Sequence, residues 1–133
     1  MNKTFLQIAV LSGALSVILG AFGAHGLKQI VDENGLKIFE TAVRYQFYHV
    51  FALALTGVLY KEFGSKYLYY AGWMFIIGMI FFSGSLYVLT YKTAANVSGL
   101  NWVGLITPIG GVFLIMGWIC LAFAVSAKKA KNQ

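Results

Sequence analysis

The sequence has few charged residues, and those it has are unevenly placed. Asp, Glu, Lys and Arg together make up 11% of the 133 residues, whereas soluble domains carry about 25%. None of these residues occurs within four stretches, 4–27, 45–60, 67–91 and 93–127. A helix needs roughly 20 mainly apolar residues to cross the hydrocarbon core of a bilayer. The pattern excludes a water-soluble domain and predicts a protein that crosses a membrane several times.

Residues that carry catalysis or hold metals are also scarce. The one cysteine, Cys120, excludes an internal disulfide, and we interpret it as a small buried apolar residue. His25 and His49 have no cysteine or carboxylate at ligand spacing, so neither a metal site nor a cofactor is expected. The "SGS" at 83–85 does not match a serine-nucleophile elbow. We therefore expect no catalytic residues and a protein that is not an enzyme.

The net charge of +6 does not indicate nucleic-acid binding, because the basic residues lie at the ends of apolar segments. Six of them fall on one side of the membrane and four on the other: Lys3, Lys61, Lys66, Lys128, Lys129 and Lys131 against Lys28, Lys37, Arg44 and Lys92. Cytoplasmic loops carry the excess of Lys and Arg, so both termini are predicted in the cytoplasm of a multi-pass plasma (inner) membrane protein. The basic tail at 128–131 is mainly an orientation signal and is also expected to contact anionic lipids.

The apolar pattern predicts an all-α fold, a four-helix bundle that forms a single transmembrane domain over residues 1–133. Transmembrane helices are expected at about 4–26, 35–62, 67–91 and 108–127. The charge-free core of the second helix has only 16 residues, 45–60, so its first turns are expected at the membrane surface. Between the last two helices, 101–106 is expected to form a short interfacial or re-entrant piece.

Small residues mark the helix ends. Gly26, in the stretch "GAFGAHGL" (20–27), fits a residue that ends the first helix. The same stretch resembles a signal-peptide cleavage region. We reject cleavage because small residues continue at four-residue spacing through Gly20 and Ala24, as a retained packing helix requires. Thr107 and Pro108 fit the N-cap and the first position of the last helix.

Stripes of small residues predict where the helices pack. In lipid, small side chains let helix backbones approach closely. The packing residues expected are Ser12, Ser16, Gly20 and Ala24 on the first helix, Ala71 and Gly78 on the third, and Gly110, Gly117 and Ala124 on the fourth. Such faces also favour a homo-oligomer.

Polar residues gather in the outer half of the predicted bundle, at the ends of the helices opposite the termini. They are His25, Glu40, Arg44, Tyr45, Gln46, His49, Ser83, Ser85, Tyr87 and Thr107. Glu40 and Arg44 are spaced as a surface ion pair, and His25 fits the carbonyl end of a helix. His49 lies deeper, where ionisable residues are costly and suggest a function.

Two interpretations of this cluster stay open, a structural hydrogen-bond cluster and a site for a small solute, a proton or a lipid head group. The binding hypothesis, in which transport or channel activity would be one outcome, is the leading one. It requires a cavity that reaches His49 and touches at least two other helices. A structural or accessory membrane subunit is the second hypothesis, and an intramembrane enzyme the third.

Four ordered motifs carry a family resemblance: "GAFGAHGL" (20–27), "FETAVRYQFYHVFAL" (39–53), "FFSGSLYVLT" (81–90) and "GLITPIGGVFLIMGW" (104–118). Together they resemble domain-of-unknown-function family 423, small four-helix membrane proteins of bacteria that are similar to the animal transmembrane protein 256. The resemblance implies an integral membrane protein without an assigned activity. The connector "YKTAANVSGLNW" (91–102) looks a few residues longer than is usual for the family.

Overall fold

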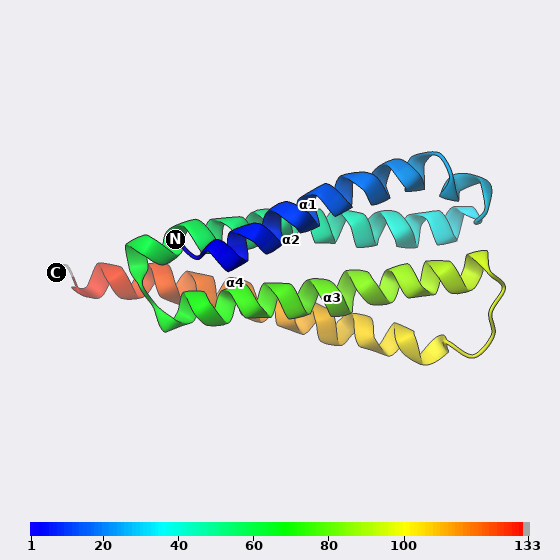
Figure 1. Cartoon of the computed structure of the whole chain (residues 1–133). Helices are drawn as coiled ribbons and strands as arrows, with labels where there is room; N and C mark the ends of the chain where they lie inside the picture. Colours follow the sequence, from blue (N-terminus) through cyan, green and yellow to red (C-terminus); the bar gives the residue numbers. More distant parts are fainter. Residues whose placement is uncertain (132–133) are drawn as a thin grey trace.

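The structure, a computed structural model, describes residues 1–131 and the side chains of residues 1–127. Its elements are α1 (Lys3–Ala24), the short 3-10 helix η1 (Leu27–Gln29), α2 (Glu33–Phe63), α3 (Lys66–Ala94), the 3-10 helix η2 (Asn101–Leu105) and α4 (Ile106–Lys131). The four long helices run up and down, so α1 begins and α4 ends at the same end of the bundle (Figure 1). This confirms the predicted all-α, four-helix fold.

Neighbouring helices in the chain are neighbours in space. The helix α1 packs on α2, α2 on α3 and α3 on α4, with a smaller contact between α2 and α4. Figure 1 shows the result as two helix pairs, α1 with α2 and α3 with α4. The outward sides of α1 and α4 are apolar and open; Val10 and Leu11 are each 70% exposed. Such exposed apolar surfaces are suited to contact with lipid tails.

Three segments of the described residues are long and apolar enough to cross a membrane: Lys3–Gln29, Lys66–Ala94 and Asn101–Ala127. The helix α2 crosses by connectivity, because it joins the outer end of α1 to the inner end of α3. Its 31 residues span about 46 Å at 1.5 Å per residue, which exceeds a hydrocarbon core of about 30 Å. Its lower hydropathy is tolerated because polar residues in its middle are buried by neighbouring helices.

The helix α1 ends at Ala24, within two residues of the predicted end at Gly26, but without the left-handed glycine that such an ending uses. Gly26 has φ −71°, an ordinary right-handed value, and the chain continues directly into η1. His25 is the C-cap residue, and its backbone N–H donates to Ala21 O at 3.2 Å. The start of α1 is capped by Asn2, whose side chain accepts from the N–H of Phe5 at 3.2 Å.

The predicted start of α4 at Thr107 and Pro108 is wrong. The helix begins at Ile106, because η2 leads straight into it and supplies its first turn. Pro108 is then the third helical residue, where the missing N–H would have had no partner within the helix. Residues 101–105 of the predicted 101–106 segment form η2, whose Trp102 and Leu105 are exposed as interface residues are.

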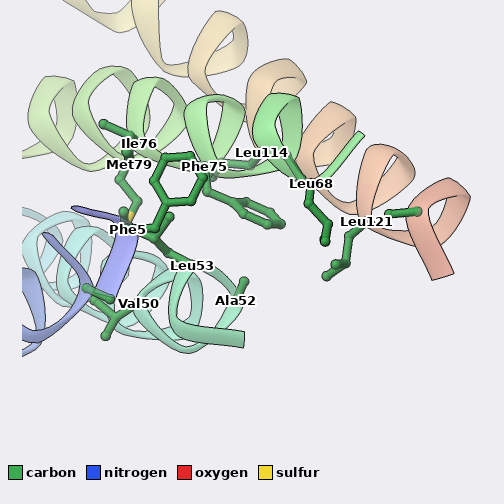
Figure 2. Packing of buried hydrophobic residues seen from close by; sticks show 13 residues of the cluster. Phe5, Val50, Ala52, Leu53, Leu68, Phe75, Ile76, Met79, Leu114 and Leu121 are labelled. Carbon is green, nitrogen blue, oxygen red and sulfur yellow. The ribbon is translucent and has the colours of Figure 1, made fainter. Parts of the chain in front are cut away.

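The hydrophobic core lies between the helix pairs, toward the termini. Phe5, Leu53, Leu68 and Phe75 are almost completely buried there (Figure 2). The ring of Phe5 reaches from α1 onto Gly72 of α3, where a Cβ atom would clash with it. This contact joins the two pairs at their inner end.

The contact between α3 and α4 is tight. A Cβ on Gly110 would lie 2.8 Å from the Cα of Phe82, and one on Gly78 would lie 2.5 Å from the side chain of Leu114. A Cβ on Gly117 would lie 2.6 Å from the ring of Phe75. The two helix backbones therefore approach each other closely along this contact.

The contact between α1 and α2 is looser at Gly13 and Gly20 than at Gly23, where a Cβ would lie 2.9 Å from the Phe39 ring. A Cβ on Gly13 would lie 3.3 Å from Val50, and one on Gly20 would lie 3.7 Å from Val43. Ser16 is buried, while Ala24 is exposed at the outer end. Small residues on this face leave a furrow between the two helices.

Candidate functional site

Gln46 links three helices by hydrogen bonds. Its side-chain Nε2 donates to the backbone carbonyl of Ser12 on α1 at 3.1 Å. Its Oε1 accepts from the hydroxyl of Tyr87 on α3 at 2.8 Å. Ser16 donates to the same Ser12 carbonyl at 2.8 Å. The amide of Gln46 thus fixes α1, α2 and α3 relative to one another.

His49 is enclosed by protein and is only 5% exposed. Its Nδ1 lies 2.7 Å from the carbonyl of Tyr45, which can only accept, so Nδ1 carries the proton. The indole N–H of Trp118 on α4 donates to Nε2 at 3.2 Å. The ring of Phe75 packs at 5.8 Å on the same imidazole. His49 is thus a neutral imidazole with both nitrogens bonded, which fits the structural interpretation of this residue.

The binding hypothesis predicts a cavity that reaches His49. Five surface grooves of the described chain lie elsewhere, and His49 does not line any of these five. The His49–Trp118 contact also lies near the middle of the bundle along its long axis, because Trp118 is close to the centre of α4. The burial of His49 and the contacts of its two ring nitrogens favour the structural interpretation of this residue.

Two serines of α3 link the remaining helix contacts. Ser83 donates to the Ala42 carbonyl of α2 at 2.8 Å. The hydroxyls of Ser85 and Thr107 of α4 lie 2.7 Å apart, and Ser85 also donates to Phe82 O at 2.9 Å. Within the described side chains, no buried polar atom lacks a hydrogen-bond partner. These polar residues form interhelical contacts at successive depths, and Gln46 and Tyr87 also line a surface groove of about 340 Å³ together with Ser12.

Three of the predicted site residues lie outside these contacts. His25, Glu40 and Arg44 are exposed at the outer end of α1 and on the first half of α2. Glu40 and Arg44 form no ion pair with each other; the ion pair of the described residues is Lys37 with Glu33, at 2.7 Å. Tyr45 is 40% exposed, and its ring lies 4.8 Å from that of Phe82.

Glu40 and Arg44 line a groove of about 380 Å³ between α1 and α2. Only these two helices contribute to it: Ser16, Val17, Gly20, Gly23, Ala24, Phe39, Glu40, Val43, Arg44 and Phe47. A second furrow of about 320 Å³ follows the same helix contact toward the termini and shares Val17 and Phe47 with the first. We call the two together the α1–α2 groove. It is apolar along its length, opens away from α3 and α4, and has its two charges near one end.

The register of the helices gives the depth of these charges. Val43 packs on Gly20 and Phe39 packs on Gly23, so Arg44 and Glu40 lie beside residues 20–23 of α1. Along α2, which begins at Glu33, Glu40 and Arg44 lie about 10 and 16 Å from the start of the helix at 1.5 Å per residue. The two charges therefore stand near the outer limit of the hydrocarbon core.

Two features of the site were missed from the sequence. Trp118 was not expected as the partner of His49, although an indole N–H in mid-membrane needs an acceptor. The groove was not expected either. Its signal is a matched spacing of seven, Gly13 and Gly20 on α1 against Val50 and Val43 on α2.

Fold and site together define a small polytopic membrane protein with a hydrogen-bonded interior and a groove that opens to the bilayer. A family model described as "Protein of unknown function (DUF423)" matches residues 19–111. The chain belongs to this family, as the motifs predicted. The matched part contains both charged residues of the groove.

Related proteins are called membrane proteins. A UPF0382 membrane protein of Staphylococcus aureus is 42% identical over 122 residues, which cover 92% of this chain and 94% of that protein. A UPF0382 membrane protein of Haemophilus influenzae is 39% identical over 133 residues, 98% of this chain and 99% of the relative. YwdK of Bacillus subtilis, also a UPF0382 membrane protein, is 37% identical over 92% of this chain and 95% of its own. No solved structure matches the chain.

Proposed function

We propose that this protein is a non-enzymatic membrane protein that binds a phospholipid in the α1–α2 groove. The acyl chain lies along the apolar floor, and the head group lies beside Glu40 and Arg44. One observation carries the proposal: two opposite charges that form no ion pair stand at the end of an apolar groove open to the bilayer. Unpaired charges at the edge of the hydrocarbon need a polar partner.

The dimensions of the groove support a lipid chain. Its lining runs along α1 from Ala24 to Ala9, about 22 Å at 1.5 Å per residue. The head groups of a bilayer occupy roughly 5–8 Å on each side of the hydrocarbon core. A long Arg44 side chain can bring its guanidinium to this layer while its stem covers apolar surface.

The buried polar contacts support a structural role for the rest of the cluster. Gln46, His49 and Ser83 have their polar atoms bonded to neighbouring helices. A solute or proton pathway through the bundle would have to break these bonds. We therefore favour the lipid head group among the ligands considered, and assign transport no part in the proposal.

The orientation and surroundings complete the proposal. Both termini face the cytoplasm of the plasma membrane, because six basic residues lie on their side against four on the other. The tail at 128–131 contacts anionic lipids; its side chains lie outside the described residues. Copies of the chain associate through the open apolar faces of α1 and α4.

Filling the groove is expected to abolish stabilisation by lipid. A purified full-length chain in detergent, given palmitoyl-oleoyl phospholipids with mixed head groups, should show a rise in Tm of about 4 °C or more at lipid well above Kd. Gly20→Leu should remove this rise, because its side chain occupies the groove while its Cβ meets Val43 at an ordinary 3.7 Å.

Gly84→Leu is the matched control. It is also a helical glycine, on α3, with nothing within 4 Å of the place that a Cβ would take. It lines a different groove, to which α1, α2 and α3 contribute and which Gln46 and Tyr87 also line. This variant should keep the lipid-dependent rise. Loss of the rise in Gly84→Leu alone would contradict the proposed location, and absence of any rise in the parent protein would favour an accessory subunit without a ligand.

A further inference from the structure

We propose that the α1–α2 groove selects phospholipids whose head group carries a primary ammonium, as phosphatidylethanolamine does. The inference rests on the proposed function and adds the head-group chemistry. It comes from the order of the two charges along α2. Glu40 is nearer the outer end and Arg44 is one turn deeper, about 6 Å along the helix axis.

This order matches the order of charges in an aminophospholipid. The phosphate is attached nearer the acyl chains, and the ammonium lies beyond it, toward water. With the acyl chain on the floor at Val17 and Phe47, the phosphate comes to the level of Arg44 and the ammonium to that of Glu40. A guanidinium binds phosphate by two parallel hydrogen bonds, and a carboxylate accepts from the N–H groups of an ammonium.

Other head groups fit these charges less well. A glycerol head group gives Glu40 no cation and leaves its carboxylate close to a phosphate, which is repulsive. A choline head group is cationic, but its methylated nitrogen has no N–H to donate. The arrangement therefore predicts an order of preference, ethanolamine before choline before glycerol.

A second copy of the chain fits the groove less well than a lipid does. Two copies related by a two-fold axis along the membrane normal bring the same residue of each copy to the same depth. Glu40 would then face Glu40, and Arg44 would face Arg44. Like charges would meet near the hydrocarbon, so charge complementarity favours the zwitterionic lipid.

Native mass spectrometry of the full-length chain tests the inference. The protein is equilibrated with equal amounts of palmitoyl-oleoyl phosphatidylethanolamine, phosphatidylcholine and phosphatidylglycerol, and the retained lipids are counted. The parent protein should retain phosphatidylethanolamine most. Glu40→Gln should lower the ratio of bound phosphatidylethanolamine to phosphatidylglycerol about tenfold, and Arg44→Gln should lower retention of all three lipids by a similar factor.

Glu33→Gln and Lys37→Gln are the controls. They remove one charge each from a pair with the same spacing, one to two turns away and outside the groove lining, and should leave the ratios unchanged. If Gly20→Leu abolishes lipid retention but Glu40→Gln leaves the head-group ratios unchanged, the head-group inference is overturned. The proposed lipid site then still holds. If Gly20→Leu does not change lipid retention, or if a dimer forms in the groove in place of bound lipid, both the head-group inference and the proposed lipid site are overturned.

Discussion

Replacing Gly110 with alanine should lower the free energy of unfolding by about 3 kcal/mol, the upper part of the range for overpacking. The added Cβ would lie 2.8 Å from both the Cα of Phe82 and the carbonyl carbon of Phe81. These are backbone atoms of α3, so no side chain can rotate away, and α3 and α4 would have to separate. Unfolding in mixed detergent–SDS micelles, followed by circular dichroism, measures the change.

Gly111→Ala is the control for this prediction. It makes the same change at the next residue of α4, where the Cβ would lie an ordinary 3.7 Å from the Phe82 ring. Alanine is a better helix former than glycine by about 1 kcal/mol, so this variant should be as stable as the parent protein or more stable. Equal losses in both variants would show that the close approach of α3 and α4 is wrong.

Replacing Gln46 with leucine should lower the free energy of unfolding by about 2 kcal/mol. The change leaves the hydroxyl of the half-buried Tyr87 without its acceptor, and an unpaired polar group costs about 1–3 kcal/mol where it is fully buried. It also removes the hydrogen bond that the Gln46 side chain of α2 donates to the Ser12 carbonyl of α1. The same unfolding measurement applies.

A double-mutant cycle with Tyr87→Phe separates the hydrogen bond from the packing. When both partners are apolar, neither is left unpaired, so the loss in the double variant should be smaller than the sum of the single losses by about 1 kcal/mol. Tyr45→Phe, which removes a hydroxyl from an exposed ring, should cost much less. Additive losses in the cycle would contradict the Gln46–Tyr87 contact.

The helical architecture was predictable because a bilayer imposes a simple length rule. The charge-free stretches 4–27, 67–91 and 93–127 contain most of the three segments long and apolar enough to span a membrane. The helix α2 was harder, since its charge-free core is short. Its place follows from connectivity, and burial of Gln46 and His49 against other helices explains why it tolerates polar residues.

The details of the site were less predictable because they depend on distant contacts. The bond between His49 and Trp118 joins residues 69 positions apart, and no local pattern shows which helix faces the imidazole. The capping residues at the end of α1 and the start of α4 were misassigned for a related reason. A two-residue turn and η1 follow α1, and η2 runs straight into α4, so the capping roles expected of Gly26 and Thr107 are not needed there.

The surroundings of Glu40 and Arg44 also depend on distant contacts that the sequence does not reveal. Their spacing fits a surface ion pair, yet in the structure they line a groove with α1 and do not bond to each other. Only the packing of α1 on α2 reveals the apolar floor beside them. The predicted polar residues thus include a set that hydrogen-bonds between helices and four exposed residues, His25, Glu40, Arg44 and Tyr45. Of these four, Glu40 and Arg44 line the groove.

The central claim is that the ligand site is the groove and not the set that hydrogen-bonds between helices, and lipid retention in native mass spectrometry tests it most directly. Three variants of the full-length chain are compared with the parent: Gly20→Leu in the groove, and His49→Phe and Tyr87→Phe, which change a buried and a half-buried residue of the interhelical hydrogen bonds. We predict that Gly20→Leu loses the bound phospholipid, while His49→Phe and Tyr87→Phe retain it despite lower stability. Retention in Gly20→Leu, with loss in the folded His49→Phe and Tyr87→Phe variants, would contradict the account.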